Sequence, residues 1–151
     1  MLEYVKGNLV TGNYDVFCHQ VNCKGVMGAG IAKQIRDKYP EVYHAYIANH
    51  RLGADRLGTN LYVKTKDDRV CVNMFAQDCY GRDKRHTDYG AFRSCLVDLK
   101  DFLAHESENV IVAFPYGIGC GLAGGDWVLI QGMLKEFSEQ VQQKVLIVSL
   151  G

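Results

Sequence analysis

Short runs of β-branched and aromatic residues alternate along the chain with longer segments whose apolar residues recur at helical spacing. This alternation is typical of a sheet with helices on both faces, so the pattern predicts an α/β fold. The runs that predict strands are residues 2–6, 15–21, 59–64, 70–75, 110–114 and 145–150. The segments that predict helices are residues 31–39, 40 to about 51, 89–104 and 127–141.

The third and fourth predicted strands are joined by the charged turn Lys66-Asp67-Asp68-Arg69, which predicts an antiparallel hairpin. Helical segments separate most of the other strands. No internal repeat or low-complexity tract interrupts the pattern. Residues 1–151 are therefore expected to form a single domain, which is an ordinary size for one hydrophobic core.

Composition narrows the classes of ligand. Hydrophobic residues make up 48% and charged residues 23% of the chain, which is ordinary globular usage. Seventeen basic residues balance seventeen acidic ones, so sequence-independent binding to a nucleic-acid backbone is not expected. A small anionic ligand stays possible, because backbone N–H groups bind phosphates without net positive charge.

The N-terminus has neither a basic region nor a long apolar run, and no segment reaches the length of a membrane helix. We therefore expect no membrane partner and a cytoplasmic protein. The six cysteines lack paired C-x-x-C spacing and mostly lie in apolar segments, so we expect free thiols, no zinc or other metal, and no cofactor.

Two glycine-rich loops are the strongest candidates for a binding site. Each follows a buried strand and precedes a helix: residues 22–30 after the second strand, and residues 115–125, of which five are glycine, after the fifth. Glycine allows positive φ and close approach of the backbone to a ligand. One such loop alone favours a tight turn that brings helix against strand. Two loops at the carboxyl ends of two strands favour a diphosphate ligand.

Four motifs, in these loops and in the strands and turns before them, resemble the macro domain family. They are Lys6-Gly7-Asn8-Leu9, His19-Gln20-Val21-Asn22, Gly28-Ala29-Gly30-Ile31-Ala32 and Pro115 with Gly117-Ile118-Gly119-Cys120-Gly121-Leu122. They are most similar to the branch containing terminal ADP-ribose protein glycohydrolase and the yeast-type ADP-ribose 1″-phosphate phosphatase. The resemblance covers nearly the whole chain and implies a three-layer αβα fold with a mixed six-stranded sheet and an ADP-ribose cleft at the strand ends.

The resemblance also implies which residues bind ADP-ribose. Asn8, with Leu9 beside it, stands where the family usually has an aspartate that accepts a hydrogen bond from the adenine amino group. Asn22 matches an asparagine that contacts the terminal ribose, although an asparagine here also suits a turn. The remaining matches lie in the loops beside the ribose and around the diphosphate: Gly28, Ala29, Gly30, Ile31, Gly117, Ile118, Gly119, Cys120, Gly121 and Leu122.

Two catalytic groups of the glycohydrolase branch are missing. Its lysine after the fourth strand aligns with Gln77, and its aspartate after the second glycine loop aligns with Ala123. Without an amine at that position no Schiff base can form, so the covalent lysine mechanism is not expected. Lys24, Lys33 and Lys84 are replacements only if the fold brings one of them into the cleft.

Three candidates remain for acid–base chemistry, each with a structural alternative. Asp126 could act as general base at the terminal ribose, or cap the helix that follows it. His19 resembles a histidine of the yeast-type phosphatase and could act on a leaving group, or be a hydrogen-bonded core residue. The polar loop of residues 77–86 could fold over the terminal ribose, or be an ordinary solvated loop.

These observations lead to two main hypotheses. The first is a hydrolase that cleaves a bond at the terminal ribose of ADP-ribose, linked to a protein side chain, an acetyl ester or a 1″-phosphate. Asn22 would orient the ribose and Asp126 would activate water. The second is a non-catalytic reader that binds ADP-ribose or an ADP-ribosylated macromolecule. A nicotinamide-dependent oxidoreductase fits the α/β pattern but lacks a G-x-G-x-x-G fingerprint with an acidic partner downstream.

Overall fold

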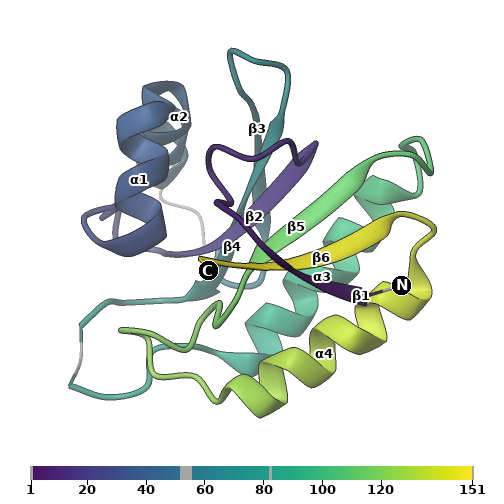
Figure 1. Cartoon of the computed structure of the whole chain (residues 1–151). Coiled ribbons are helices and arrows are strands. Elements are labelled where there is room, and N and C mark those ends of the chain that lie inside the picture. Colours follow the sequence, from purple (N-terminus) through teal and green to yellow (C-terminus); the bar gives the residue numbers. More distant parts are fainter. Residues whose placement is uncertain (1, 52–55, 82, 151) are drawn as a thin grey trace.

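A computed structural model describes residues 2–51, 56–81 and 83–150, and its elements follow the hydrophobic pattern closely (Figure 1). The strands are β1 (Leu2–Lys6), β2 (Val16–Asn22), β3 (Asn60–Lys64), β4 (Val70–Gln77), β5 (Ile111–Pro115) and β6 (Lys144–Ser149). The helices are α1 (Gly30–Lys38), α2 (Pro40–Arg51), α3 (Tyr89–Leu103) and α4 (Trp127–Gln140). The main difference is that β4 continues to Gln77, because β2 continues to Asn22 and pairs with it there.

The strands form one six-stranded sheet in the order β1-β6-β5-β2-β4-β3. All neighbouring pairs are parallel except β3 and β4, which form the predicted antiparallel hairpin. The sheet is therefore mixed, as the family resemblance implies. None of the helices in the described ranges is long and apolar enough to span a bilayer.

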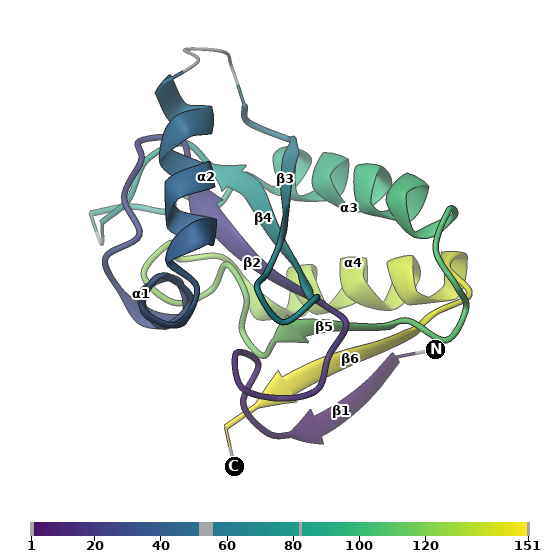
Figure 2. The same cartoon turned by 90° about the horizontal axis from the view of Figure 1, so that it is seen from above.

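Helices cover both faces of the sheet (Figure 2). On one face α1 and α2 pack over alternate strand residues such as Phe17 and Phe75. On the other face α3 and α4 pack over the intervening residues, such as Cys18 and Phe114. Side chains of successive strand residues point to opposite faces, so β2 contributes to both cores. The expected three-layer αβα arrangement is confirmed.

A crevice opens between β2 and β5 because these neighbours pair only at Val16↔Val112 and Phe17↔Ala113 and are not paired beyond. Connections leave this point in opposite directions: β2 leads through α1 and α2 toward β3 and β4, whereas β5 leads through α4 to β6. In open α/β sheets, ligands bind at the carboxyl ends of strands where the connections diverge in this way. The fold therefore places a binding crevice between the two glycine-rich loops.

Candidate functional site

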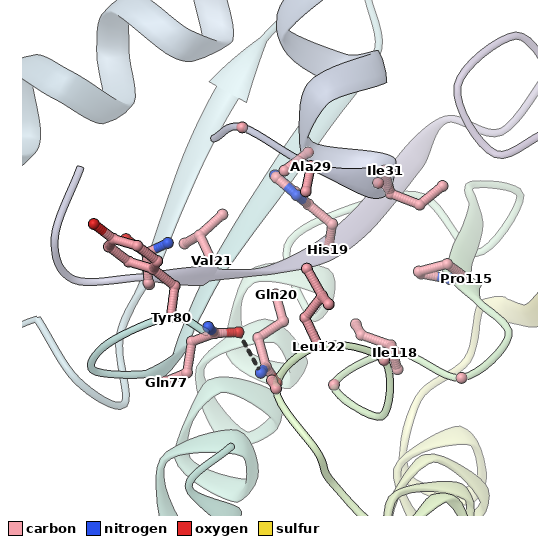
Figure 3. A pocket seen from close by; sticks show the side chains of 18 of the residues that line it. His19, Gln20, Val21, Ala29, Ile31, Gln77, Tyr80, Pro115, Ile118 and Leu122 are labelled. Atoms are coloured by element: carbon pink, nitrogen blue, oxygen red, sulfur yellow. Dashed lines mark hydrogen bonds between the residues drawn. The ribbon is translucent and has the colours of Figure 1, made fainter. Parts of the chain in front are cut away.

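A cleft of about 490 Å³ lies at the carboxyl ends of β2 and β5, between the two glycine-rich loops. This volume is in the usual range of small-molecule sites. Figure 3 shows Ala29 of the first loop and Ile31 of α1 facing Ile118 and Leu122 of the second loop across the cleft. The sequence-predicted residues that line it are His19, Asn22, Gly28, Ala29, Gly30, Ile31, Gly117, Ile118, Gly119, Gly121 and Leu122.

The first loop is shaped from behind by Asn22 and Tyr46. The Asn22 Oδ1 atom accepts hydrogen bonds from the Lys24 and Val26 N–H groups at 3.0 and 3.3 Å, and its Nδ2 atom donates to the Val26 carbonyl at 2.8 Å. Asn22 thus organises the turn while also lining the cleft. One Nδ2 hydrogen remains for a ligand, since an amide nitrogen carries two.

Tyr46 of α2 is fully buried beneath the same loop. Its Oη atom accepts hydrogen bonds from the Gly25 and Val26 N–H groups, both at 3.1 Å, and donates to Asn22. Burial raises the pKa of the Tyr46 hydroxyl well above its usual range, so the group stays protonated. No motif in the sequence indicated Tyr46 as a residue of the site. The available signal was a tyrosine on the apolar face of a helix, whose hydroxyl needs a partner when buried.

The N-terminus of α1 has no side-chain cap. Its N-cap residue is Ala29, and its first turn contains no acidic residue. The first intrahelical bond comes from the Lys33 N–H to the Ala29 carbonyl, so the N–H groups of Gly30, Ile31 and Ala32 have no intrahelical partner. These three residues line the cleft. Orphan N–H groups at a helix N-terminus form a ready site for an anion.

The second loop presents further backbone donors. Within the described part of the chain, no group accepts a hydrogen bond from the N–H groups of Gly119, Gly121 or Leu122. Gly119 has φ +76°, and a Cβ atom there would lie 2.8 Å from the Gln20 side-chain oxygen. Only glycine fits this position without strain or displacement. Donors from α1 and from this loop therefore converge on one cleft.

His19 lies in the floor of the cleft, on the face of β2 that carries α1 (Figure 3). Its Nε2 atom lies 2.6 Å from the Asn73 Oδ1 atom, while Asn73 Nδ2 donates to the Leu61 carbonyl. Asn73 Oδ1 can only accept, so His19 carries its proton on Nε2 and presents an unprotonated Nδ1. Nδ1 is buried and has no hydrogen-bond partner among the described residues. Burial lowers the pKa of His19 to about 4, partly offset by Asn73, so the ring is a neutral acceptor.

At the end of the cleft near the loop after β4, Gln77 occupies the position that the resemblance gives to a lysine. Its Oε1 atom accepts a hydrogen bond from Gln20 Nε2 at 2.7 Å, and its Nε2 atom donates to the Cys79 carbonyl at 2.7 Å. Both polar atoms of Gln77 are therefore held by the protein. The candidate replacement lysines do not line the cleft: Lys24 pairs with Asp78, Lys33 pairs with Asp37, and Lys84 lies in the exposed loop.

The polar loop reaches the cleft through Tyr80 and Gly81, which line it beside Gln77. Farther along, His86 Nε2 lies 2.8 Å from Asp83 Oδ1, and the His86 N–H donates to the Ala123 carbonyl of the second glycine loop. This loop is thus tied to the second glycine loop and borders one end of the site.

Three residues predicted to bind ADP-ribose lie outside the lining of the cleft. Asn8 Oδ1 already accepts hydrogen bonds from the Val10 and Thr11 N–H groups at 2.9 and 3.1 Å, so it caps a turn. Leu9 is buried in the core, and Cys120 turns its thiol toward the Ile118 carbonyl at 3.4 Å. Their roles as ligands stay predictions.

Asp126 is placed as a helix cap. Its Oδ1 atom accepts a hydrogen bond from the Val128 N–H at 2.9 Å at the start of α4, and the residue is exposed. It does not line the cleft. The expectation that Asp126 activates water at the terminal ribose therefore has no support from its position, because a general base must lie within hydrogen-bonding reach of the proton it removes.

No charged side chain lines the cleft within residues 2–51, 56–81 and 83–150. The titratable groups there are His19, which is neutral above a pH of about 4, and the hydroxyls of Tyr80 and Tyr116. No group of three His, Cys, Asp or Glu side chains that could hold a metal was found in the described residues. The site can bind an anion through backbone N–H groups and a hydroxyl donor through neutral acceptors.

Comparisons with known proteins agree with this geometry. The family model of the macro domain matches residues 18–130. The ADP-ribose 1″-phosphate phosphatase of Scheffersomyces stipitis is 35% identical over 178 residues, which cover 97% of this chain and 100% of that protein. The DNA ADP-ribosyl glycohydrolase of Thermus aquaticus is 36% identical over 148 residues, covering 94% of this chain but only 39% of that longer protein.

Among solved structures, the macrodomain of Mycobacterium tuberculosis DarG superposes with a TM-score of 0.85 at 24% identity, covering 100% of this chain and 98% of that one. At this identity the likeness establishes the fold alone. Together with the family model, which spans most of the chain, it identifies the chain as a member of the macro domain family.

Proposed function

We propose that this protein binds ADP-ribose in the cleft and hydrolyses a bond at the terminal ribose. The observation that carries the proposal is the convergence of unpaired backbone N–H groups from α1 and the second glycine loop on one uncharged cleft. The names of the two relatives support it, since one is a phosphatase of ADP-ribose 1″-phosphate and the other a DNA ADP-ribosyl glycohydrolase.

The middle of the cleft suits the diphosphate. The N-terminus of α1 supplies the donors of Gly30 and Ile31 together with a favourable helix dipole, and the second loop supplies those of Gly119 and Gly121. A diphosphate held between them would satisfy donors that have no partner in the described protein. This explains how a chain with no net charge can bind a doubly charged ligand.

The two ends of the cleft differ in polarity, and this sets the direction of the ligand. Ile31 and Pro115 lie at one end, and Tyr80 and Gln77 at the other (Figure 3). We assign the adenine ring, which is flat and weakly hydrated, to the first end. The hydroxyl-rich terminal ribose then lies near Asn22 and Gln77, whose amides match its hydrogen-bonding groups.

The uncharged lining limits which bond can be cleaved. No carboxylic acid, ammonium group or imidazolium lines the cleft, so the only side-chain acids there are the weakly acidic hydroxyls of Tyr80 and Tyr116, which are poorly suited to protonate a poor leaving group. Carboxylates and phosphates leave as stable anions and need no proton. We therefore propose that the substrates are acyl esters of ADP-ribose and ADP-ribose 1″-phosphate, with most of the rate supplied by positioning.

The same lining is what favours a second candidate function, a reader that binds ADP-ribose without cleaving anything. Both candidates use the same donors, but the reader needs no water near the terminal ribose. Binding assays alone cannot separate them.

The test is a panel of substrates incubated with the purified protein and followed by mass spectrometry. It contains ADP-ribose 1″-phosphate, 1″-O-acetyl-ADP-ribose, a glutamate-linked ADP-ribosyl peptide, a serine-linked ADP-ribosyl peptide and ADP-ribosylated single-stranded DNA. We expect consumption of the first three. Binding of ADP-ribose with no consumption of any substrate would select the reader, and consumption of the serine-linked peptide would contradict the leaving-group argument.

A further inference from the structure

Gln20 is held in a single orientation by its side-chain nitrogen. Nε2 donates to Gln77 Oε1 at 2.7 Å and to Thr87 Oγ1 at 2.9 Å. The Thr87 hydroxyl itself donates to the Gly119 carbonyl at 2.6 Å, so it faces Gln20 as an acceptor. Both N–H bonds of the Gln20 amide are thereby used. If the amide were flipped, its oxygen would face Gln77 Oε1 and Thr87 Oγ1, which are both acceptors, and both hydrogen bonds would be lost.

The other end of the amide has no partner in the described protein. Gln20 Oε1 is buried and has no hydrogen-bond partner among the described residues, while Gln20 lines the cleft. Gly119 lies directly beside this oxygen, where a Cβ atom would come within 2.8 Å. A buried acceptor without a partner is unfavourable, and native proteins normally satisfy such atoms with water or a ligand. An O–H donor is therefore expected at Gln20 Oε1.

The position of this acceptor fits the reaction proposed above. Gln20 and Gln77 lie side by side in Figure 3, joined by the hydrogen bond between their amides, at the end of the cleft assigned to the terminal ribose. Asp126, the base expected from the sequence, lies outside the lining. A neutral amide oxygen can hold and orient a water molecule although it cannot take its proton.

We propose that Gln20 is a catalytic residue that holds the attacking water through Oε1, and that Gln77 and Thr87 are positioning residues that fix its amide. This inference rests on the proposed hydrolase function. In a substrate whose acyl or phosphoryl group is attached at the 1″ oxygen, the water oxygen forms a bond to C1″ of the terminal ribose as the bond from C1″ to the leaving oxygen breaks. The carboxylate or phosphate departs with the electron pair, and the added water loses its extra proton to solvent.

The test compares Gln20→Met, which keeps the length of the side chain but removes both polar atoms, with Gln142→Met at an exposed position away from the cleft. We expect kcat for the best substrate of the panel to fall about 100-fold in Gln20→Met. The Kd for ADP-ribose should change less than about threefold, because the water contributes to the reaction more than to ground-state binding. Gln142→Met should match the wild-type protein.

Thr87 provides a second pair of variants in case Gln20→Met does not fold. Thr87→Val removes the acceptor that fixes the Gln20 amide, whereas Thr87→Ser keeps it, so kcat should fall in the first and be retained in the second at similar ADP-ribose affinity.

Unchanged kcat in Gln20→Met, or equal kcat in the two Thr87 variants, would overturn the assignment while the hydrolase function stands. If the wild-type protein consumes no substrate of the panel, the proposed function fails, and the role of Gln20 fails with it.

Discussion

At the scale of single residues, the first glycine-rich loop is held by neutral polar groups behind it. Tyr46 and Asn22 together engage the N–H groups of Lys24, Gly25 and Val26, each within 3.3 Å. These groups would otherwise need water at the base of the loop. The position of the uncapped N-terminus of α1 therefore depends on a buried tyrosine that touches no ligand.

Tyr46→Phe removes the hydroxyl, which takes the acceptor from the Gly25 N–H and leaves the Val26 N–H with only its 3.3 Å bond to Asn22 Oδ1. We expect the free energy of unfolding to fall by about 1–3 kcal/mol. The Kd for ADP-ribose should rise about tenfold as the loop loses its fixed shape. Urea unfolding and calorimetry measure the two effects. Tyr43→Phe, on the same helix but partly exposed, is the control. Equal behaviour of the two variants would show that the Tyr46 hydroxyl does not shape the site.

Two variants of Asp126 distinguish a role as helix cap from a role as general base. Asparagine caps a helix about as well as aspartate, whereas alanine does not. We expect Asp126→Asn to keep both stability and turnover. Asp126→Ala should lose about 1 kcal/mol of unfolding free energy with turnover intact. Thermal unfolding and the hydrolysis assay give both values. Loss of most turnover in Asp126→Asn would restore the carboxylate as general base.

At the scale of elements, the strands and helices were predictable because each has a strong local pattern. The buried runs of β2, β4 and β5 and the helical spacing in α3 and α4 depend only on neighbouring residues. The contacts among the residues that line the cleft depend on residues far apart in the sequence. Gln20 and Gln77 are 57 residues apart, and their contact arises only when β2 and β4 pair in register. No spacing in the sequence indicates such a contact.

Gly119 connects the second glycine loop to this amide network. Gly119→Ala places a Cβ atom 2.8 Å from Gln20 Oε1 at φ +76°, so the loop or the amide must shift. We expect lower stability by about 1–3 kcal/mol and loss of most ADP-ribose affinity. Gly132→Ala in α4, where nothing lies within 4 Å of the added Cβ, should instead raise stability by roughly 0.5–1 kcal/mol. Denaturant titration tests both, and a stable Gly119→Ala that binds normally would contradict the packing argument.

At the scale of the whole molecule, a chain without net charge carries a binding cleft without charged side chains. Family motifs indicated the fold and the two loops, and the structure brings these loops together. The motifs also pointed to Asn8, whose side chain caps a turn, while its place before a helix suggested Asp126, whose side chain caps that helix. A binding role for Asn8 and a catalytic role for Asp126 stay predictions. A motif gives the position of a residue along the chain, but it does not say whether local backbone donors already use its side chain.

His19 couples the cleft to the stability of the fold. Burial lowers its pKa from 6.5 to about 4, so as pH falls the unfolded chain takes up a proton before the folded one does. As pH falls from 6.5 to about 4, the free energy of unfolding should decrease by up to about 1.4 kcal/mol per pH unit. Urea unfolding at about pH 7 and about pH 5 measures the change. It should shrink in His19→Gln and persist in His44→Gln, whose ring is exposed. An equal change in both variants would argue against a buried neutral His19.

The most direct measurement of the central claim is a calorimetric titration of the protein with ADP-ribose, with ribose 5-phosphate in a parallel titration. If backbone donors from both glycine loops hold a diphosphate, ADP-ribose binds one to one, ribose 5-phosphate binds far more weakly, and Gly119→Ala removes most of the heat. Absence of heat at about 1 mM ADP-ribose, or equal affinity for the two ligands, would contradict the account.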